Sequence, residues 1–411
     1  MKNVLIIPPF NPYPLVSGGH QAIFNGIAIL EGVANVYLIV PLTESQYKRN
    51  EHKAIVEVLP YVHVIPFILP SSRHTLKWYI QVFKNKYCKR WMKAKEQQTS
   101  QEETSIINDW IGDTWEEEYE LVEKVIKQHK IDIVQSEMIP NLPIIKVIPS
   151  NVKSVFVHHE LRFVRNELIA QQAAKVSKEN LQQIAEDKKR EIDYLNQYDE
   201  IVTLSPIDSE KLKEAGVTKP IVTSMAVVRE QKKKIEDIAP KKVLTFIGPE
   251  FHAPNYEGVM WFLEKVWGIL LKKDPEFSLQ IIGKWSDDTK LRLEVLYPNV
   301  HCLGFVDDIA MAMAGSTMVV PILVGSGIRM KILEAAQLRV PVVATSVGAE
   351  GLPLEDGKNI FIADKAEDFV EAILRLQDAK LRKSFVDSIA TTILPQYSLA
   401  ALRENRKDLY V

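Results

Sequence analysis

Three charged residues follow a glycine-rich turn in the second half of the sequence. The turn is Gly325-Ser326-Gly327, and Arg329, Lys331 and Glu334 come directly after it. The spacing of the next apolar residues predicts a helix, whose first N–H groups attract anions. Cations are unfavourable in a first helical turn unless an anion lies between them. Arg329 and Lys331 therefore indicate a bound phosphate, and Glu334 could reach a sugar hydroxyl.

An ordinary amphipathic helix is the alternative interpretation of this stretch. Lys331 and Glu334 are three residues apart and could form a surface ion pair. Ile328, Ile332 and Ala335 would then form the apolar stripe that faces the core.

Two other groups of residues stand at predicted strand ends. Gly18 and Gly19 follow the apolar segment 3–8 and precede a predicted helix, while His158 and His159 end the apolar segment 154–158. Ligands of open α/β sheets bind at the carboxyl ends of the strands. A plain tight turn would also explain the two glycines. The histidine pair, followed by Glu160, favours a functional role.

The elements that position these residues alternate between strand and helix in both halves of the chain. This pattern predicts an α/β fold with two facing Rossmann-like, doubly wound parallel sheets. Residues 228–242 are rich in Lys and Glu and are predicted to link them. We expect an N-terminal domain at 1–228 and a C-terminal domain at 229–395. A helix at about 396–411 would fold back and could pack on the N-terminal domain.

Composition excludes several classes of protein. The 411 residues carry a net charge of −2, which argues against nucleic acid as the main partner. Cys88 and Cys302 lie far apart and predict neither a disulfide framework nor a metal site. No apolar run reaches the roughly 20 residues of a membrane span. We therefore expect a cytoplasmic protein.

The stretch from Arg73 to Lys95 combines basic and aromatic residues and contains no acidic residue. This composition suits an anionic membrane surface or a polyanionic acceptor. A solvated basic helix face is the alternative. The first interpretation predicts peripheral attachment to the inner face of the cell membrane.

Three stretches of the second half carry a resemblance to a known family. They read FIGPEFHAPNYEGVMWFLEKV, VHCLGFVDDIAMAMAGSTMVVPILVGSGIRMKILEA and VPVVATSVGAEGL. They resemble the donor-binding domain of family 4 retaining glycosyltransferases, which have the GT-B fold. The resemblance spans Val243 to about Arg375. The first half is similar more loosely, through Ser-Gly-Gly at 17–19, VFVHHELRFVR and EIVTLSPIDSEKL.

The resemblance implies roles for individual residues. Glu334 matches the second glutamate of the family's Glu-x7-Glu motif, which typically binds the nucleotide ribose, whereas Ser326 stands where the first glutamate is expected. The family's Arg and Lys pair after the strand ending at Gly248 is also absent, so Arg329 and Lys331 would supply the charge for the diphosphate. The expected donor site comprises Gly248, Asn255, Gly325, Ser326, Gly327, Arg329, Lys331, Glu334 and Glu350.

On the acceptor side, Gly18 and Gly19 match the family loop that closes on the diphosphate. His159 matches the family histidine near the reacting sugar, and His158 is the alternative registration. The expected catalytic residues are therefore His159, Glu334, Arg329 and Lys331.

The resemblance implies a glycosyltransferase that moves a sugar from a UDP- or GDP-sugar to a glycan or lipid-linked acceptor, with retention, in surface polysaccharide or glycolipid synthesis. We expect neither a cofactor nor a metal, because no Asp-x-Asp motif is suitably placed. The alternatives are a sugar-nucleotide epimerase or hydrolase on the same fold, and a nucleotide-sugar-binding protein without activity.

Overall fold

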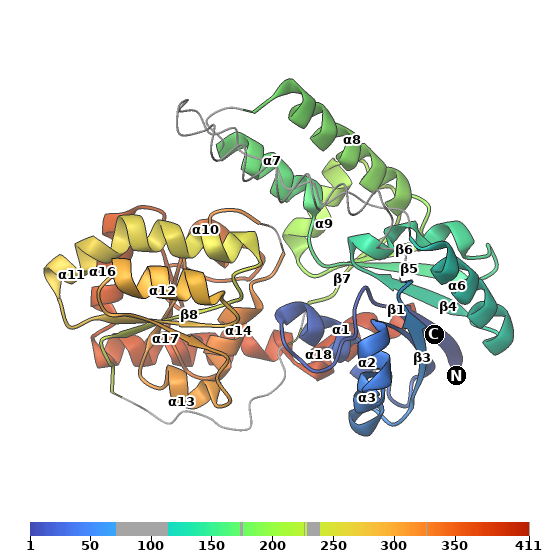
Figure 1. Cartoon of the computed structure of the whole chain (residues 1–411), viewed down its shortest axis with the longest axis horizontal. Helices are drawn as coiled ribbons and strands as arrows, with labels where there is room; N and C mark the ends of the chain where they lie inside the picture. Colours follow the sequence, from blue (N-terminus) through green and yellow to red (C-terminus); the bar gives the residue numbers. More distant parts are fainter. Residues whose placement is uncertain (71–113, 173–175, 226, 228–238, 326, 411) are drawn as a thin grey trace.

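The computed structural model describes residues 1–70, 114–172, 176–225, 227, 239–325 and 327–410. These residues form two α/β halves that lie side by side (Figure 1). Each half is built on one parallel sheet, of seven strands in the first and six in the second. The predicted GT-B architecture of two Rossmann-like sheets is thus confirmed. The domain boundaries stay a prediction, because most of the expected linker lies outside the described residues.

The first sheet has the strand order β3-β2-β1-β4-β5-β6-β7. Its strands are β1 (Lys2–Ile7), β2 (Ala34–Leu42), β3 (Val62–Ile68), β4 (Ile133–Glu137), β5 (Lys153–His158), β6 (Glu200–Thr203) and β7 (Ile221–Thr223). The order reverses between β1 and β4, which makes this pair the topological switch point.

The second sheet repeats the pattern, with the order β10-β9-β8-β11-β12-β13. Its strands are β8 (Val243–Ile247), β9 (Ser278–Ile282), β10 (Val300–Gly304), β11 (Thr317–Val320), β12 (Val342–Ala344) and β13 (Phe361–Ile362). The switch point here lies between β8 and β11. Ligands of such sheets bind at the carboxyl ends of these two strands.

Helices cover the faces of both sheets. Those of the first half are α1 (Gly18–Ala28), α2 (Glu44–Lys48), η1 (Glu51–Lys53), α3 (Ala54–Val58), α6 (Glu116–His129), η5 (Ile139–Val147), α7 (Arg162–Gln172), α8 (Lys178–Leu195) and α9 (Pro206–Glu214). Those of the second half are α10 (Ala253–Trp261), η6 (Phe262–Trp267), α11 (Gly268–Lys273), α12 (Asp287–Leu296), α13 (Ile309–Met313), α14 (Met330–Gln337), α15 (Ser346–Ala349), α16 (Ala366–Arg375) and α17 (Ala379–Thr392).

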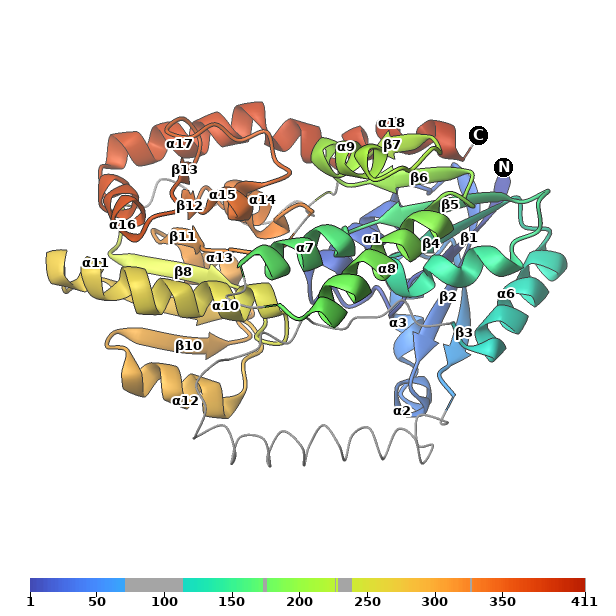
Figure 2. The ribbon, with the colours of Figure 1, turned by 90° about the horizontal axis from the view of Figure 1, so that it is seen from above.

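The last helices return to the first half. Helix α17 continues through η7 (Leu394–Tyr397), α18 (Leu399–Arg406) and η8 (Lys407–Leu409). Both ribbon views show α18 alongside the first half (Figures 1 and 2). Leu402, Leu409 and Tyr410 are buried in the core of the first half. Arg406 Nε also donates a hydrogen bond of 2.7 Å to Ser224 Oγ.

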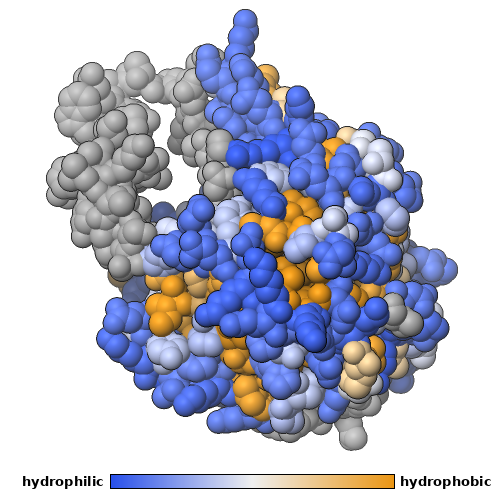
Figure 3. Space-filling view, turned by 90° about the vertical axis from the view of Figure 1, so that its right-hand side faces the viewer, coloured by the Kyte–Doolittle hydropathy of each residue, from blue (hydrophilic) through white to orange (hydrophobic). Residues whose placement is uncertain are grey.

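Among the described residues, no helix is both long and apolar enough to cross a bilayer. The face at the first-half end of the molecule is mainly hydrophilic, with apolar residues gathered near its middle (Figure 3). The basic stretch Arg73–Lys95 lies outside the described residues, so its predicted membrane contact stays a prediction.

Gly258 provides a test of the packing that places α10 beside the second sheet. A Cβ added to Gly258 would lie 2.4 Å from the carbonyl oxygen of Pro321, just beyond β11. We expect Gly258→Ala to lower the free energy of unfolding by about 1–3 kcal/mol, because the backbone must shift. Urea unfolding followed by circular dichroism measures this change.

Gly268 is the matched control on the next helical segment. An added Cβ there meets no atom within 4 Å, and its φ of −63° suits any residue. Gly268→Ala should leave stability unchanged or raise it by about 0.4–1 kcal/mol. Equal losses in the two variants would contradict the packing described here.

Candidate functional site

The carboxyl ends of the two switch-point strand pairs face each other across the molecule, and close contacts join them. A Cβ added to Gly327, which follows β11, would lie 2.7 Å from the backbone oxygen of His159, which follows β5. A Cβ on Gly18, after β1, would lie 3.1 Å from Cγ of Met330 at the start of α14. Gly18 and Gly327 therefore stand where the two halves meet, and a side chain at Gly327 would collide with the backbone of the other half.

Lys331 points into the second half at this junction. Its Nζ donates to Asn255 Oδ1 at 2.9 Å and lies 4.4 Å from the ring centroid of Phe246. Burial and, to a smaller extent, the charge of Arg329 lower its pKa to about 7, while the charge of Glu334 opposes the shift. The ammonium is thus poorly solvated, and no carboxylate of the described residues lies at hydrogen-bond distance from it, which favours binding of an anion.

Asn255 holds the lysine through a fixed geometry. Its Nδ2 donates to the Pro249 carbonyl at 3.0 Å, which leaves Oδ1 for Lys331. Gly248 makes room for this arrangement, since a Cβ there would lie 2.5 Å from Asn255 Nδ2. These two predicted donor-site residues therefore act together at the end of β8.

Glu334 forms a contact between the two halves. Its Oε1 accepts a hydrogen bond of 2.6 Å from Nε2 of Gln21 on α1. Burial raises the pKa of Glu334, against the lowering effects of Gln21 and of the Lys331 charge. The surface ion pair considered as an alternative for Lys331 and Glu334 is not what the structure contains, because each side chain has another polar partner.

Arg329 lies at the N-cap position of α14, next to the glycine turn. Its Nη1 donates to the carbonyl of Gly327 at 3.1 Å. Burial lowers its pKa, and the carboxylates of Glu160, Glu350 and Asp208 act in the opposite direction. Glu160 and Asp208 belong to the first half and Glu350 to the second, so Arg329 interacts with carboxylates of both halves.

Glu350, predicted at the donor site, spans the same junction. It pairs with Lys211 of α9, with Nζ 2.6 Å from Oε1. Both side chains are about three-quarters buried, so the pair is shielded more than an ordinary surface ion pair. In this arrangement Glu350 joins the halves, and a ligand would have to share it with Lys211.

The two predicted histidines have different surroundings. His159 is 9% exposed, and its Nε2 lies 2.6 Å from Oε2 of Glu137 at the end of β4. His158 is fully buried, with Nε2 2.8 Å from Oε1 of Glu191 on α8. His158 is thus enclosed between β5 and α8, whereas His159 keeps some exposure, and the acceptor-side roles of both histidines stay predictions.

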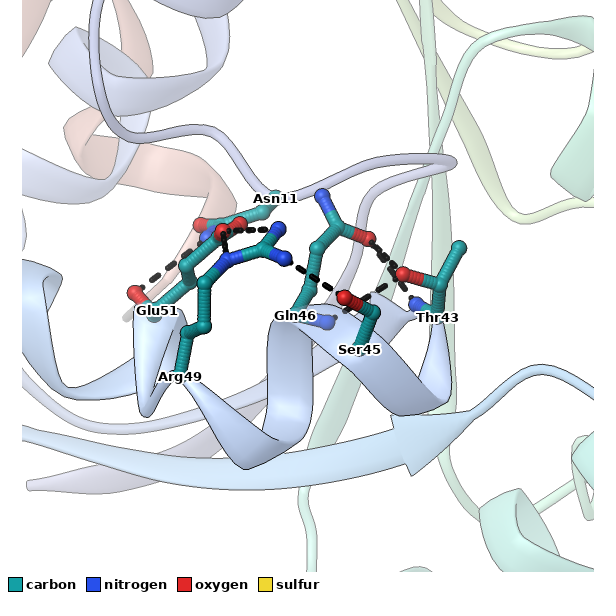
Figure 4. Close-up of polar contacts among 6 residues, drawn as sticks. All are labelled: Asn11, Thr43, Ser45, Gln46, Arg49 and Glu51. Atoms are coloured by element: carbon teal, nitrogen blue, oxygen red, sulfur yellow. Dashed lines mark hydrogen bonds and ion pairs between the residues drawn. The ribbon is translucent and has the colours of Figure 1, made fainter.

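Polar side chains also gather at the carboxyl ends of β1 and β2. Figure 4 shows them: Asn11, Thr43, Ser45, Gln46, Arg49 and Glu51. Arg49 donates to Ser45 Oγ at 2.5 Å and to Glu51 Oε1 at 2.8 Å. Asn11, in the loop that leads to Gly18, donates to the backbone oxygen of Glu51 at 3.5 Å. This network supports the loop between β1 and α1.

Several residues of the site were not expected from the sequence. Gln21, Glu137 and Lys211 each contact a predicted site residue. Glu137 carried a detectable signal, because Gln135-Ser136-Glu137 places polar residues at the end of a buried strand. Ser326 lies outside the described residues. Within the described part of the chain, no group of three or more His, Cys, Asp or Glu side chains could hold a metal ion.

Sequence comparison identifies part of the second half. A family model described as glycosyl transferases group 1 matches residues 241–379. An uncharacterized 44.6 kDa protein in the cps region of Klebsiella pneumoniae is 26% identical over 137 residues. The match covers 31% of this chain and 35% of that protein, so it concerns about a third of either one.

Solved structures extend the similarity to both halves, at identities that show the fold alone. TarM superposes with a TM-score of 0.69 and 13% identity, over 100% of this chain and 99% of TarM. HepE of Anabaena, in complex with UDP, superposes with a TM-score of 0.65 and 12% identity, over 100% of this chain and 99% of HepE. A sucrose-phosphate synthase of Thermosynechococcus elongatus superposes with a TM-score of 0.69 and 13% identity, over 100% of this chain and 98% of the synthase. The chain therefore has the GT-B fold, and residues 241–379 are similar to the glycosyl transferases group 1.

Proposed function

We propose that this protein transfers a sugar from a nucleotide-diphosphate sugar to a glycan or lipid-linked acceptor. One observation carries the proposal: Arg329 and Lys331 are both desolvated at the start of α14, directly after Gly327, which lies against the backbone oxygen of His159 of the other half. A nucleoside diphosphate supplies the negative charge that this position favours. HepE has been solved with UDP and with UDP-glucose, which supports a nucleotide sugar as the ligand class.

The reaction follows from these charges. The bond between the anomeric carbon and the β-phosphate oxygen breaks, and its electron pair stays on the phosphate. Arg329, Lys331 and the first N–H groups of α14 stabilise this growing negative charge. A new bond forms from the acceptor hydroxyl oxygen to the anomeric carbon, and the hydroxyl proton is released. His159 would orient the donor sugar, and Glu334 the ribose.

Pathway, stereochemistry and metal use belong to the same proposal. The resemblance to family 4 enzymes supports retention of anomeric configuration, which NMR of the product measures. The Klebsiella pneumoniae relative lies in a cps region, which supports a role in surface polysaccharide synthesis. We propose transfer without a metal; full activity in excess EDTA would support this, and restoration only by a divalent cation would contradict it.

An acceptor separates transfer from the alternatives. Release of UDP or GDP from a panel of nucleotide sugars should rise when a glycan or lipid-linked acceptor is added. Release that no acceptor alters would favour a hydrolase, and conversion of the donor sugar an epimerase. Calorimetry that detects no UDP or GDP binding at millimolar concentration would favour a protein with a non-functional donor site.

Lys331→Met tests the charge at the diphosphate. Methionine fills a similar volume but cannot neutralise the leaving group, so kcat/KM should fall about 10²–10³-fold. Steady-state nucleotide release measures the change. The melting temperature should not fall, because a poorly solvated ammonium is removed.

Lys358→Met is the matched control, since Lys358 is exposed and pairs with nearby Glu355 on the surface of the second half. Its kinetics should equal those of the wild type. Comparable activity in Lys331→Met and Lys358→Met would refute the assignment.

Proton uptake gives a second test. With a pKa of about 7, Lys331 is mostly neutral at pH 8 before a ligand binds. A bound diphosphate raises the lysine pKa, so binding of UDP at pH 8 should take up about one proton, and affinity should fall as pH rises above 7. Titration calorimetry in buffers of different ionisation enthalpy counts the protons.

The same titration of Lys331→Met supplies the reference for this proton. Uptake that is equal in the wild type and the variant would assign the proton to another group and would contradict the role of Lys331.

We also propose peripheral attachment to anionic membranes through Arg73–Lys95, which rests on composition alone. Sedimentation with phosphatidylserine vesicles should decrease as salt is added, because screening weakens such contacts. No sedimentation, or sedimentation that salt leaves unchanged, would argue against it.

A further inference from the structure

A chain of buried hydrogen bonds runs from Tyr410 to His159. The Tyr410 hydroxyl lies 2.5 Å from Gln135 Oε1, and Gln135 Nε2 lies 2.5 Å from Glu137 Oε1. The second oxygen of Glu137 lies 2.6 Å from His159 Nε2. All three side chains that lead to the histidine are at most 2% exposed.

The strand geometry explains why these groups meet. Gln135 and Glu137 are two residues apart on β4, so their side chains lie on the same face of the sheet. Tyr410 reaches that face because α18 and η8 pack on the first half, where Leu409 O also accepts a 3.0 Å hydrogen bond from Lys153. The contact therefore joins residues that are 275 positions apart in sequence.

The chemistry of these groups determines which of them donates and which accepts in each hydrogen bond. An ionised Glu137 can only accept, so the amide nitrogen of Gln135 must face it and the amide oxygen must face Tyr410. Burial raises the pKa of Tyr410 to about 12, so its hydroxyl keeps the proton that it donates. The other Glu137 oxygen then accepts from Nε2–H of His159. This leaves Nδ1 as the ring nitrogen available to a substrate.

We propose that Tyr410 is a positioning residue for His159. It acts through the two side chains between them, by setting the orientation of Gln135 and thereby of the Glu137 carboxylate. This proposal deepens the proposed function, because it rests on the role given there to His159. Without the tyrosine hydroxyl, the Gln135 amide loses the partner that holds its oxygen, and the imidazole loses part of its orientation.

Tyr410→Phe tests this inference by removing one oxygen atom. We expect kcat to fall roughly five- to tenfold while the donor KM stays within about twofold, since one buried hydrogen bond is lost at a distance from the ligand. Glu137→Gln removes the carboxylate itself and should reduce kcat about 10- to 100-fold, as for other residues that orient a site side chain.

Tyr397→Phe is the matched control. Tyr397 is also 2% exposed, but its buried hydroxyl has no hydrogen-bond partner within the described part of the chain. This variant should keep wild-type kinetics. If Tyr410→Phe melts below the assay temperature, Gln135→Met interrupts the same chain and takes its place.

A spectroscopic measurement separates this inference from the proposed function. NMR of protein labelled with 15N-histidine shows which ring nitrogen of His159 carries the proton, with His159→Asn to assign the signals. We expect Nε2–H in the wild type and in Tyr397→Phe, and altered His159 ring signals in Tyr410→Phe. Unchanged His159 signals in Tyr410→Phe would overturn the inference, even if activity fell.

The proposed function can fail independently of this result. If the wild type transfers no sugar but the His159 signals change in Tyr410→Phe, the hydrogen-bond chain is supported and the transferase assignment is contradicted. If transfer occurs and both kcat and the His159 signals equal those of the wild type, the transferase assignment stands and the role of Tyr410 is wrong.

Discussion

The structure depends on two buried basic side chains, Arg329 and Lys331, whose charges repel each other. Arg329 and Lys331 start one helix, and burial lowers the pKa of both. Bringing like charges out of water is unfavourable, so the fold must supply compensation at a distance. It does so with carboxylates of the opposite half, Glu160 and Asp208. The positive charge of Arg329 thus attracts carboxylates of the first half, and a bound anion would interact with the same charge. Ligand binding and contact between the halves therefore compete for Arg329.

Backbone contact is the second constraint on the junction. Gly327 lies against the backbone carbonyl of His159, and Gly18 lies against the side chain of Met330, so the lack of a side chain at each glycine allows the two halves to come close. Side chains then act across this narrow gap, as Gln21 does with Glu334 and Lys211 with Glu350. Repositioning of the halves would have to exchange these polar partners. A ligand with several hydroxyl and phosphate oxygens can replace them, which relates the shape of the junction to the class of molecule that fits it.

The sequence predicted local features well and long-range contacts poorly. The alternation of apolar segments was enough for the two parallel sheets, and the spacing of apolar residues after Gly327 correctly predicted a helix, α14. The pattern did not reveal that Lys331 would bond Asn255 rather than Glu334, because an i,i+3 spacing on a helix permits a pair without requiring it. Nor could it separate His158 from His159: successive residues of a strand point to opposite faces, and only the packing of α8 shows which face is closed. Tyr410 had no local signal, since its partner Gln135 lies far away in the chain.

The return of α18 to the first half also affects the order in which the protein can fold during synthesis. Domains usually fold as units while the ribosome completes the rest of the chain. Here the first core includes Leu402, Leu409 and Tyr410, which are translated after the entire second half. During synthesis, part of the apolar surface of the first half therefore stays exposed to water until these residues are translated. The surroundings of Glu137 are also complete only after that point. Residues that are remote in the gene thus belong to one folding unit, and an excised first half would need them supplied as a separate segment.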